Sequence, residues 1–217
     1  MPSKAQPASP SIELETKTHP SQDRSRATFD AIIRVSGEIL AERGIDGFSI
    51  NAVVQRAGLS PPAVYRYFPN KYAILKELGE RLMAAQDALA IAYIDRRGSA
   101  PLSETALIEG GHSLLRQLVQ VTAAFPGSIA VLRAMRASPI LREVRLASAR
   151  MVAARHNELL ALSYPHADKE RIQSVSWILS ELGNSVTELL IESSDEERDR
   201  LTRDCAIMFA RLQTSLV

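Results

Sequence analysis

The segment from residue 48 to residue 75 constrains the fold most, because it contains two short helical patterns separated by a glycine turn. An apolar strip over residues 50–57 predicts the first helix, and Ser49 precedes this strip as an N-cap. Gly58 then supplies the left-handed backbone conformation in which a helix often ends. The sequence therefore predicts a helix, a tight turn of about three residues and a second helix.

The second helix has its own start signals. Ser60 stands where an N-cap is expected, and Pro61 and Pro62 fit a first turn, whose N–H groups have no intrahelical partner. Because a residue before proline avoids the helical conformation, the helix begins at one proline or the other. Val64 and Phe68 are four residues apart and are expected to face inward. The remaining surface of this helix consists of Ala63, Arg66 and Tyr67.

The run AGLSPPAVYRYFPNK resembles the helix-turn-helix signature of the TetR family of transcriptional regulators. The resemblance extends over about residues 26–77. Its elements, in order, are a helix, Gly44, a capped helix, the run from Ala57 to Ser60, Tyr65, an aromatic residue at Tyr67, Phe68 and Lys71. The chain departs from the family pattern at Val53 and Val54, where Ile-Ala is frequent, and at Pro62, where glycine is frequent. These departures concern base preference more than fold.

The resemblance implies an all-α fold, with an N-terminal three-helix DNA-binding domain and a C-terminal helical domain for effector binding and dimerisation. We expect a disordered arm over residues 1–22, the helix-turn-helix domain over 23–70 and the C-terminal domain over 71–217. The composition agrees, because 46% of the residues are hydrophobic and no alternating Val/Ile/Thr run indicates a sheet. The implied function is a sequence-specific transcriptional repressor that a small-molecule effector releases from DNA.

Nine residues are candidates for DNA contact. The base-edge candidates are Ser60, Pro61, Pro62, Ala63 and Arg66. Among them, Arg66 alone can form a bidentate pair with guanine. The phosphate candidates are Ser49, Tyr65, Tyr67 and Lys71. Tyr65 and Tyr67 are either core aromatics or phosphate ligands, since a tyrosine hydroxyl needs a polar partner. Lys71 is either a solvated charge or a phosphate ligand, because it follows the predicted cap Asn70 at a helix N-terminus.

Positive charge is concentrated near the N-terminus. Residues 24–76 contain eight basic and four acidic residues, a surplus of four, whereas the whole chain has a net charge of +1. This distribution matches an electrostatic footprint on a phosphate backbone. The preceding arm is rich in Pro, Ser and Thr. The adjoining Arg24 and Arg26 either reach DNA or simply continue this arm.

The rest of the chain predicts a series of long helices. The first helix of the chain is expected over about residues 26–43, and the later ones over 71–97, 102–124, 128–136, 139–163, 168–192 and 195–215. Ser194 and Glu197 form a predicted capping box between the last two. The resemblance implies that this last pair meets its twin in a homodimer, and a monomeric core pair is the alternative. Two copies of a short reading helix fit a palindromic double-stranded operator.

Polar or aromatic residues that interrupt the apolar C-terminal helices are the candidates for effector contact. They are His112, Arg116, His156, Trp177 and Asn184. Each also has a purely structural interpretation: the histidines as surface or core residues, Trp177 as packing and Asn184 as a polar contact within the bundle.

Enzyme motifs are missing from the sequence. The four histidines show no metal-ligand spacing, and HExxH, GxSxG and phosphate-binding glycine loops do not occur, so we expect neither catalysis nor a cofactor. A single cysteine excludes an internal disulfide, and no segment has a transmembrane or secretion pattern, so we expect a cytoplasmic protein. The alternative function is a helical protein-interaction module whose basic quarter contacts an acidic partner.

Overall fold

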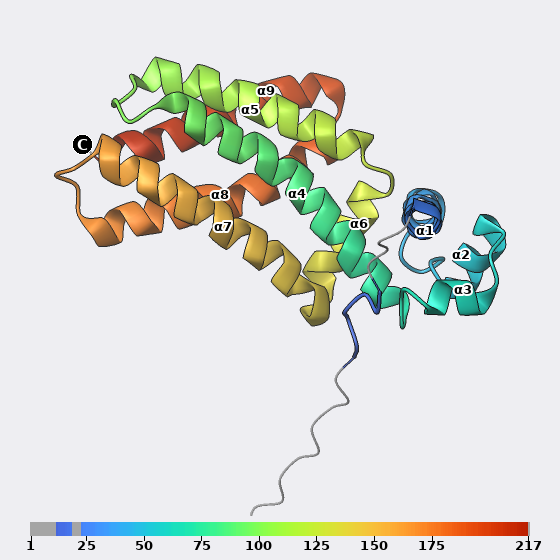
Figure 1. Cartoon of the computed structure of the whole chain (residues 1–217). Coiled ribbons are helices and arrows are strands. Elements are labelled where there is room, and N and C mark those ends of the chain that lie inside the picture. The colour runs from blue at the N-terminus through green and yellow to red at the C-terminus, as the bar shows by residue number, and fades with distance from the viewer. Residues whose placement is uncertain (1–11, 19–22, 217) are drawn as a thin grey trace, which may run out of the picture.

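The computed structural model describes residues 12–18 and 23–216, and within these residues it contains nine helices and no strand. The helices are α1 (Asp23–Arg43), α2 (Ile50–Ala57), α3 (Pro61–Tyr65), α4 (Lys71–Arg97), α5 (Glu104–Ala124), α6 (Ser128–Ala137), α7 (Pro139–Ser163), α8 (Lys169–Glu192) and α9 (Asp195–Thr214). Figure 1 shows α1–α3 as a lobe at one end, from which α4 runs into a bundle with α5, α7, α8 and α9. The predicted all-α class is confirmed.

The observed helix limits agree best with the predicted ones where the sequence carries a strong capping residue. The Ser49 hydroxyl accepts a hydrogen bond from the backbone N–H of Ala52 (3.2 Å), and α2 ends at Gly58 with a φ of 63°. At the start of α4, the side-chain oxygen of Asn70 accepts hydrogen bonds from two backbone N–H groups of the first turn. These caps set both ends of α2 and the start of α4 at the predicted residues.

Helix α3 is shorter than the aromatic pattern suggests, because it ends at Tyr65. Pro61 opens it, which decides between the two prolines. Ser60 occupies the predicted N-cap position, but its hydroxyl makes no capping hydrogen bond. The Ser60 carbonyl instead accepts bonds from the N–H groups of Ala63 and Val64.

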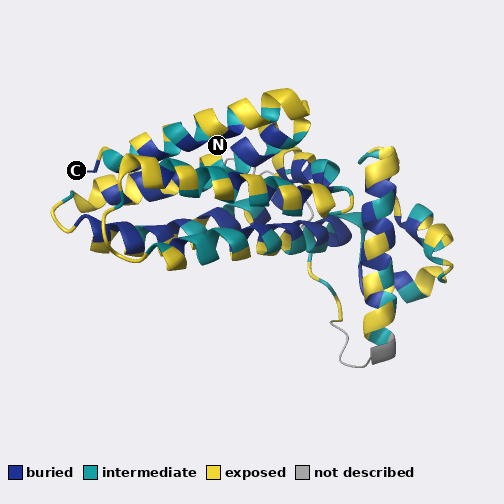
Figure 2. Ribbon diagram, turned by 90° about the horizontal axis from the view of Figure 1, so that it is seen from above, coloured by how far each residue is buried: buried dark blue, intermediate teal, exposed yellow. Residues whose placement is uncertain are grey.

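The lobe shares its apolar core with the rest of the molecule. Phe29, Ile32 and Phe68 pack in one cluster that continues through Leu78 of α4 to Met135 of α6. Figure 2 shows the buried positions on the faces that the helices turn toward one another. A lobe of about 45 residues buries too little apolar surface to be stable alone. The shared core therefore fixes the lobe against α4 and α6.

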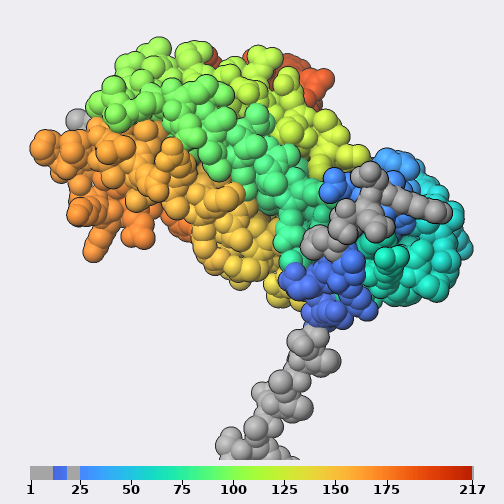
Figure 3. Space-filling view, viewed as in Figure 1, coloured from blue at the N-terminus to red at the C-terminus, as the bar shows by residue number. Residues whose placement is uncertain are grey.

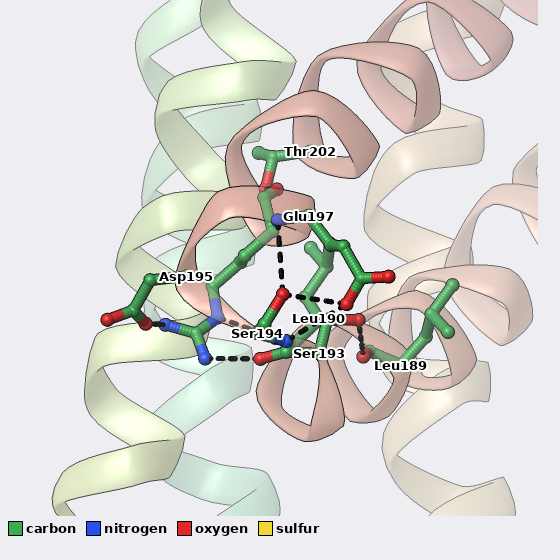
Figure 4. Close-up of polar contacts among 8 residues, drawn as sticks. Leu189, Leu190, Ser193, Ser194, Asp195, Glu197 and Thr202 are labelled. Carbon is green, nitrogen blue, oxygen red and sulfur yellow. Dashed lines mark hydrogen bonds and ion pairs between the residues drawn. The ribbon is translucent and has the colours of Figure 1, made fainter.

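The connection between α8 and α9 is a capping box, as predicted. The Ser194 hydroxyl accepts the N–H of Glu197 (3.4 Å) and donates to the Glu197 carboxylate (2.7 Å), as Figure 4 shows. Arg198 adds hydrogen bonds to the carbonyls of Leu190 and Ser193, both at 2.7 Å. These bonds satisfy carbonyls at the end of α8 and hold the two helices as a hairpin.

Part of the predicted arm is docked on the lobe. Residues 12–18 lie beneath it in Figure 3, where the Lys17 N–H donates to the Tyr67 carbonyl (2.8 Å). The Asn70 side chain donates to the Glu13 carbonyl (2.6 Å). Residues 12–18 thus contact the lobe without forming a helix or strand, and residues 1–11 and 19–22 of the predicted arm lie outside the described residues.

Over the described part of the chain, no single helix has the length and apolar character needed to cross a bilayer. Helices α5 and α6 pass that test only as a pair, and they meet at 99°.

The turn between α5 and α6 packs closely on α1. A Cβ atom on Gly37 of α1 would lie 2.8 Å from the carbonyl oxygen of Pro126, which is nearer than side-chain carbons approach. We predict that Gly37→Ala lowers the free energy of unfolding by about 1–3 kcal/mol, because α1 and the turn must separate. Urea denaturation followed by circular dichroism measures this change.

Gly183 of α8 is the matched control, because a Cβ there would meet no atom within 4 Å. Gly183→Ala is expected to stabilise the protein by up to about 1 kcal/mol through helix propensity. Equal effects of the two substitutions would contradict the close contact at Gly37.

Candidate nucleic-acid interface and ligand cavity

Eight of the nine candidate DNA contacts reach the surface of the lobe. Ser49, Ser60, Pro61, Pro62, Tyr65 and Arg66 are exposed, and Ala63 and Lys71 are half-buried. Tyr65 has 46% of its surface exposed, although tyrosine is large and partly apolar. Exposed residues lie at both ends of α3, Ser60 to Pro62 before the buried Val64 and Tyr65 with Arg66 after it, and Lys71 follows at the first residue of α4. These polar and cationic side chains belong to the lobe of α1–α3 and to the first residue of α4, at one end of the molecule (Figure 1).

Two of these side chains keep their charge unpaired. Among the described residues, neither Arg66 nor Lys71 has an ion-pair partner; each lies near an aromatic ring, at 5.7 Å from the centre of Tyr67 and 5.6 Å from that of Tyr72. Unpaired cations on an exposed surface are available to phosphates or base edges.

Other basic residues of the lobe are already neutralised. Arg56 makes two hydrogen bonds of 2.6 Å to the carboxylate of Glu42, and these bonds lower the pKa of Glu42. Lys76 pairs with Glu15 and Glu80, both at 3.1 Å. The basic surplus counted from the sequence therefore overstates the charge that is free to contact DNA.

Tyr67 is placed in the core. Its side chain is 3% exposed, its ring packs edge-on against Phe29 at 5.6 Å, and its hydroxyl donates to the carbonyl of Ser25 at 3.3 Å. Of the two interpretations of Tyr67, the structure thus favours a core aromatic residue over a phosphate ligand. Tyr67 lies beyond the end of α3 at Tyr65, so helical spacing does not place its side chain; its contact with Phe29 of α1 does.

A cavity lies within the C-terminal bundle, between α4, α5, α7, α8 and α9. Its volume is about 110 Å³, and most of its wall is aliphatic. The polar side chains of the wall are Gln86, Asp87, Tyr93, Ser148, His156, Ser180, Asn184, Thr187 and Gln213. A cavity with an apolar wall and a few polar groups is the usual form of a small-molecule site.

The five ligand candidates divide into two groups. His156 and Asn184 line the cavity, whereas His112, Arg116 and Trp177 do not. Arg116 is exposed, and Trp177 lies on a separate groove between α7 and α8. An interruption in an apolar pattern does not reveal which side of a helix faces the cavity. For this reason the sequence did not separate these three residues from the two that line it.

Sequence reasoning missed Gln86, Asp87, Ser148 and Gln213 on the cavity wall. All four are buried polar residues. The pair Gln86 and Asp87 interrupts the apolar seam of α4 between Leu82 and Leu89, which is the signal that was available.

One end of the cavity holds a buried carboxyl group. Asp87 is 7% exposed and accepts a hydrogen bond of 2.8 Å from the hydroxyl of Ser148. Burial raises the pKa of Asp87 above its ordinary value. Beside it, the Gln86 amide donates to the Thr122 hydroxyl at 2.6 Å, which links α4 to α5.

The other end holds His156 and Gln213. The Arg97 guanidinium donates to the side-chain oxygen of Gln213 at 2.6 Å and lies 3.5 Å from Nε2 of His156. Burial, with the Arg97 charge, lowers the pKa of His156 to about 4. The imidazole is therefore neutral at pH 7.

No group of three or more His, Cys, Asp or Glu side chains within residues 12–18 and 23–216 is placed to hold a metal ion.

The buried His156 predicts a pH dependence of stability. Its pKa is about 4 in the folded protein, whereas the ordinary pKa of a solvated histidine is 6.5. The unfolded chain therefore binds more protons between these values, and the free energy of unfolding falls as the pH decreases from about 6.5 to about 4. At 1.36 kcal/mol per pKa unit, the full loss is about 3 kcal/mol.

We expect His156→Gln to remove this part of the pH dependence, measured by urea denaturation at several pH values. His166, which is exposed, is the control, and His166→Gln should leave the slope unchanged. A slope that persists in the His156 variant would contradict the assignment.

Two family profiles match the chain. Residues 32–78 match the bacterial regulatory proteins of the tetR family, and residues 109–212 match the tetracyclin repressor-like C-terminal domain. The tetracycline repressor protein class A from transposon 1721 of Escherichia coli is 32% identical over 66 residues, which is 30% of this chain and 31% of that protein. The class C repressor of the same organism is 35% identical over 54 residues, 25% of each chain. The chain thus matches less than a third of the length of these relatives.

Solved structures share the fold over most of the chain. A tetR-family regulator from Streptomyces coelicolor has a TM-score of 0.63 at 21% identity and covers 87% of this chain and 81% of its own. A TetR-family protein from Mesorhizobium loti has a TM-score of 0.61 at 15% identity, with coverages of 88% and 98%. The repressor AlkX from Dietzia has a TM-score of 0.53 at 19% identity and covers 91% of this chain and 99% of its own. With both profiles matched along one chain, the protein belongs to the TetR family of DNA-binding transcriptional regulators.

Proposed function

We propose that the protein is a homodimeric repressor that binds a palindromic DNA operator and leaves it when a small molecule enters the bundle cavity. One observation carries the proposal: α4 begins at the unpaired cation Lys71 and, about 24 Å further along its axis, forms the cavity wall at Asp87. A single helix therefore connects the candidate DNA-contact surface to the candidate effector site.

The DNA contacts are assigned by chemistry and exposure. Arg66 pairs with guanine, and the other base-edge contacts come from Ser60, Pro61, Pro62 and Ala63. Ser49, Tyr65 and Lys71 contact phosphates through hydroxyl and ammonium groups. Tyr67 acts indirectly, because its buried ring and hydroxyl hold the end of α3 against α1.

Release requires that the effector binds two arrangements of the lobe with different free energy. A ligand in the cavity touches α4 and α5, and both lead to the lobe: α4 through the shared apolar core and α5 through Pro126 on Gly37. A shift of either helix moves α1 and α3 relative to the second copy. The two reading helices then no longer match successive major grooves.

The dimer is proposed to form through α8 and α9. Trp177, Leu182 and Leu189 of α8 and Met208 of α9 are exposed apolar side chains. Exposed apolar side chains in such number on a helix hairpin are typical of an interface. Met151 and Leu162 of α7 are also exposed apolar side chains, outside this hairpin. Twofold pairing sets the half-sites about 34–36 Å apart, or at a multiple of that distance.

The DNA assignment predicts different outcomes for two substitutions. Lys71→Ala should weaken binding on every sequence and reduce the slope of log affinity against log salt by about 1. Arg66→Ala should cost about 1–3 kcal/mol and relax the preference at one base pair of each half-site. Fluorescence anisotropy on an operator selected from a random DNA pool, at several salt concentrations, measures both effects.

Lys169→Ala is the matched control, because Lys169 is an exposed lysine at the start of α8 in the bundle. Equal salt slopes for the wild type and the Lys71 variant would refute the phosphate contact. Failure of the wild type to retain any DNA would favour a protein-interaction module instead.

The dimer assignment predicts that Leu189→Arg converts the protein to a monomer in sedimentation experiments, because a charge at the centre of an apolar contact remains unpaired. The affinity of this variant for a palindromic operator should fall as the dimer is lost, while its circular dichroism spectrum stays helical. Leu162→Arg in α7 is the control at an exposed leucine outside α8 and α9. Dissociation by the control and not by Leu189→Arg would move the interface from α8 and α9 to α7.

A further inference from the structure

The charge of the cavity wall is unbalanced. Of the described residues that line it, Asp87 is the single carboxylate, and none is a lysine or arginine. The other titratable side chains of the wall are Tyr93 of α4 and His156 of α7, while α5, α8 and α9 contribute none. An ionised Asp87 therefore has no counter-charge on the wall.

The hydrogen bonds of Asp87 leave much of its capacity unused. Ser148 is its one hydrogen-bond partner among the described residues, through Oδ1 at 2.8 Å. A carboxylate accepts about four hydrogen bonds. The nearby hydroxyls of Ser180 and Thr187 donate to backbone carbonyls of their own helix, at 2.9 Å each. Asp87 thus remains open to a donor that enters the cavity.

Two half-buried basic residues of the bundle, Arg145 and Arg97, do not pair with Asp87. Arg145 of α7 pairs with Glu181 of α8. Arg97 lies behind the wall at the opposite end, where it donates to Gln213 at 2.6 Å, and it is ten residues, or about 15 Å, from Asp87 along α4. Neither neutralises Asp87.

We propose that the cavity binds a small hydrophobic amine whose ammonium group pairs with the Asp87 carboxylate. This inference rests on the proposed function only in using the same cavity, and it names the chemical class of the effector. A buried carboxylate is costly unless it is paired and hydrogen-bonded, and an ammonium ion supplies both a charge and up to three donors.

The rest of the wall fits the hydrocarbon part of such a ligand. Leu115 and Leu118 of α5, Leu179 of α8 and Phe209 of α9 face the same cavity. Burial of this apolar surface supplies affinity, while the single carboxylate fixes which end of the ligand enters beside α4. The raised pKa of Asp87 agrees, because the empty cavity disfavours its ionised form until a cation arrives.

Three probes that share a phenylethyl group test the inference: phenethylamine, 2-phenylethanol and 3-phenylpropanoate. Isothermal titration calorimetry of the full-length protein without DNA measures their affinities. We expect the amine to bind at least ten-fold more tightly than the alcohol, and the carboxylate to bind most weakly. The carboxylate tests the opposite outcome, because Arg97 has two buried guanidinium nitrogens without a partner among the described residues.

Asp87→Asn keeps the shape of the side chain and removes its charge. It should weaken amine binding at least ten-fold and leave alcohol binding within two-fold. Asp95→Asn is the matched control, since Asp95 is an exposed residue of the same helix that pairs with Arg155 on the surface at 2.7 Å. Ser148→Ala provides a second variant, which keeps the carboxylate and should retain the preference for the amine.

The inference is overturned if the wild type fails to bind the amine, binds amine and alcohol equally, or prefers the carboxylate. It is also overturned if Asp87→Asn folds and binds the amine as the wild type does. The wild-type comparison decides the matter if that variant does not fold.

A separate measurement distinguishes this inference from the proposed function. Operator affinity is measured with and without the amine. Amine binding that depends on Asp87 but leaves operator affinity unchanged would support the inference and reject release by this ligand. If the protein binds the operator but not the amine, the inference is rejected while DNA binding by the protein is supported.

Discussion

The apolar contact between the helix-turn-helix lobe and α4 is the interaction on which the rest of the structure depends. Phe29 of α1 packs against Phe68 with ring centres 5.0 Å apart, and the same cluster includes Ile74 and Leu78 of α4. Without this contact the lobe would bury too little surface to hold α3 in place. The orientation of α3 is therefore set by α4, and any force that moves α4 acts on the candidate DNA-contact surface.

A second attachment makes the junction stiff. The α5–α6 turn packs on α1 so closely that neither Gly37 nor Gly127 has space for a Cβ atom, and Gly127 also has a positive φ of 72°. Near the cavity, the Gln86–Thr122 hydrogen bond joins the two helices that lead to these attachments. Packed interfaces of this kind change between discrete arrangements more readily than they deform continuously. The geometry thus suits a switch between two positions of the lobe.

Local signals in the sequence were sufficient where one residue type has a distinct backbone role. Gly58 and Asn70 set helix ends, and Ser194 with Glu197 formed the predicted capping box, because caps depend on neighbours within four residues. Ser60 shows the limit of this reasoning, since it has the right type and position but makes no side-chain cap. The prediction that Tyr67 contacts phosphate has a different limit, because the burial of this side chain depends on Phe29, almost forty residues away.

The cavity was less predictable for a related reason. Its wall combines side chains from five helices, so membership depends on the rotation of each helix within the bundle. His156 and Asn184 were identified from polarity alone, but Trp177 carries the same signal and faces outward. The buried polar pair at Gln86 and Asp87 was the more informative feature, because a charged residue inside an apolar seam needs a partner.

The proposed ligand selectivity of this cavity follows from the Asp87 carboxylate, which has one hydrogen-bond partner and no counter-charge on the wall. An apolar ligand leaves Asp87 with the same single bond to Ser148 that it already has, and a neutral donor adds a hydrogen bond but no counter-charge. An anion adds repulsion whenever Asp87 is ionised. A cation supplies both a counter-charge and hydrogen-bond donors to the carboxylate, and a site with an unpaired buried group discriminates more strongly than an apolar wall does. On the proposed assignment, a ligand of matching charge recovers part of the free energy that folding loses by burying Asp87, and that ligand contacts α4 directly because Asp87 belongs to this helix.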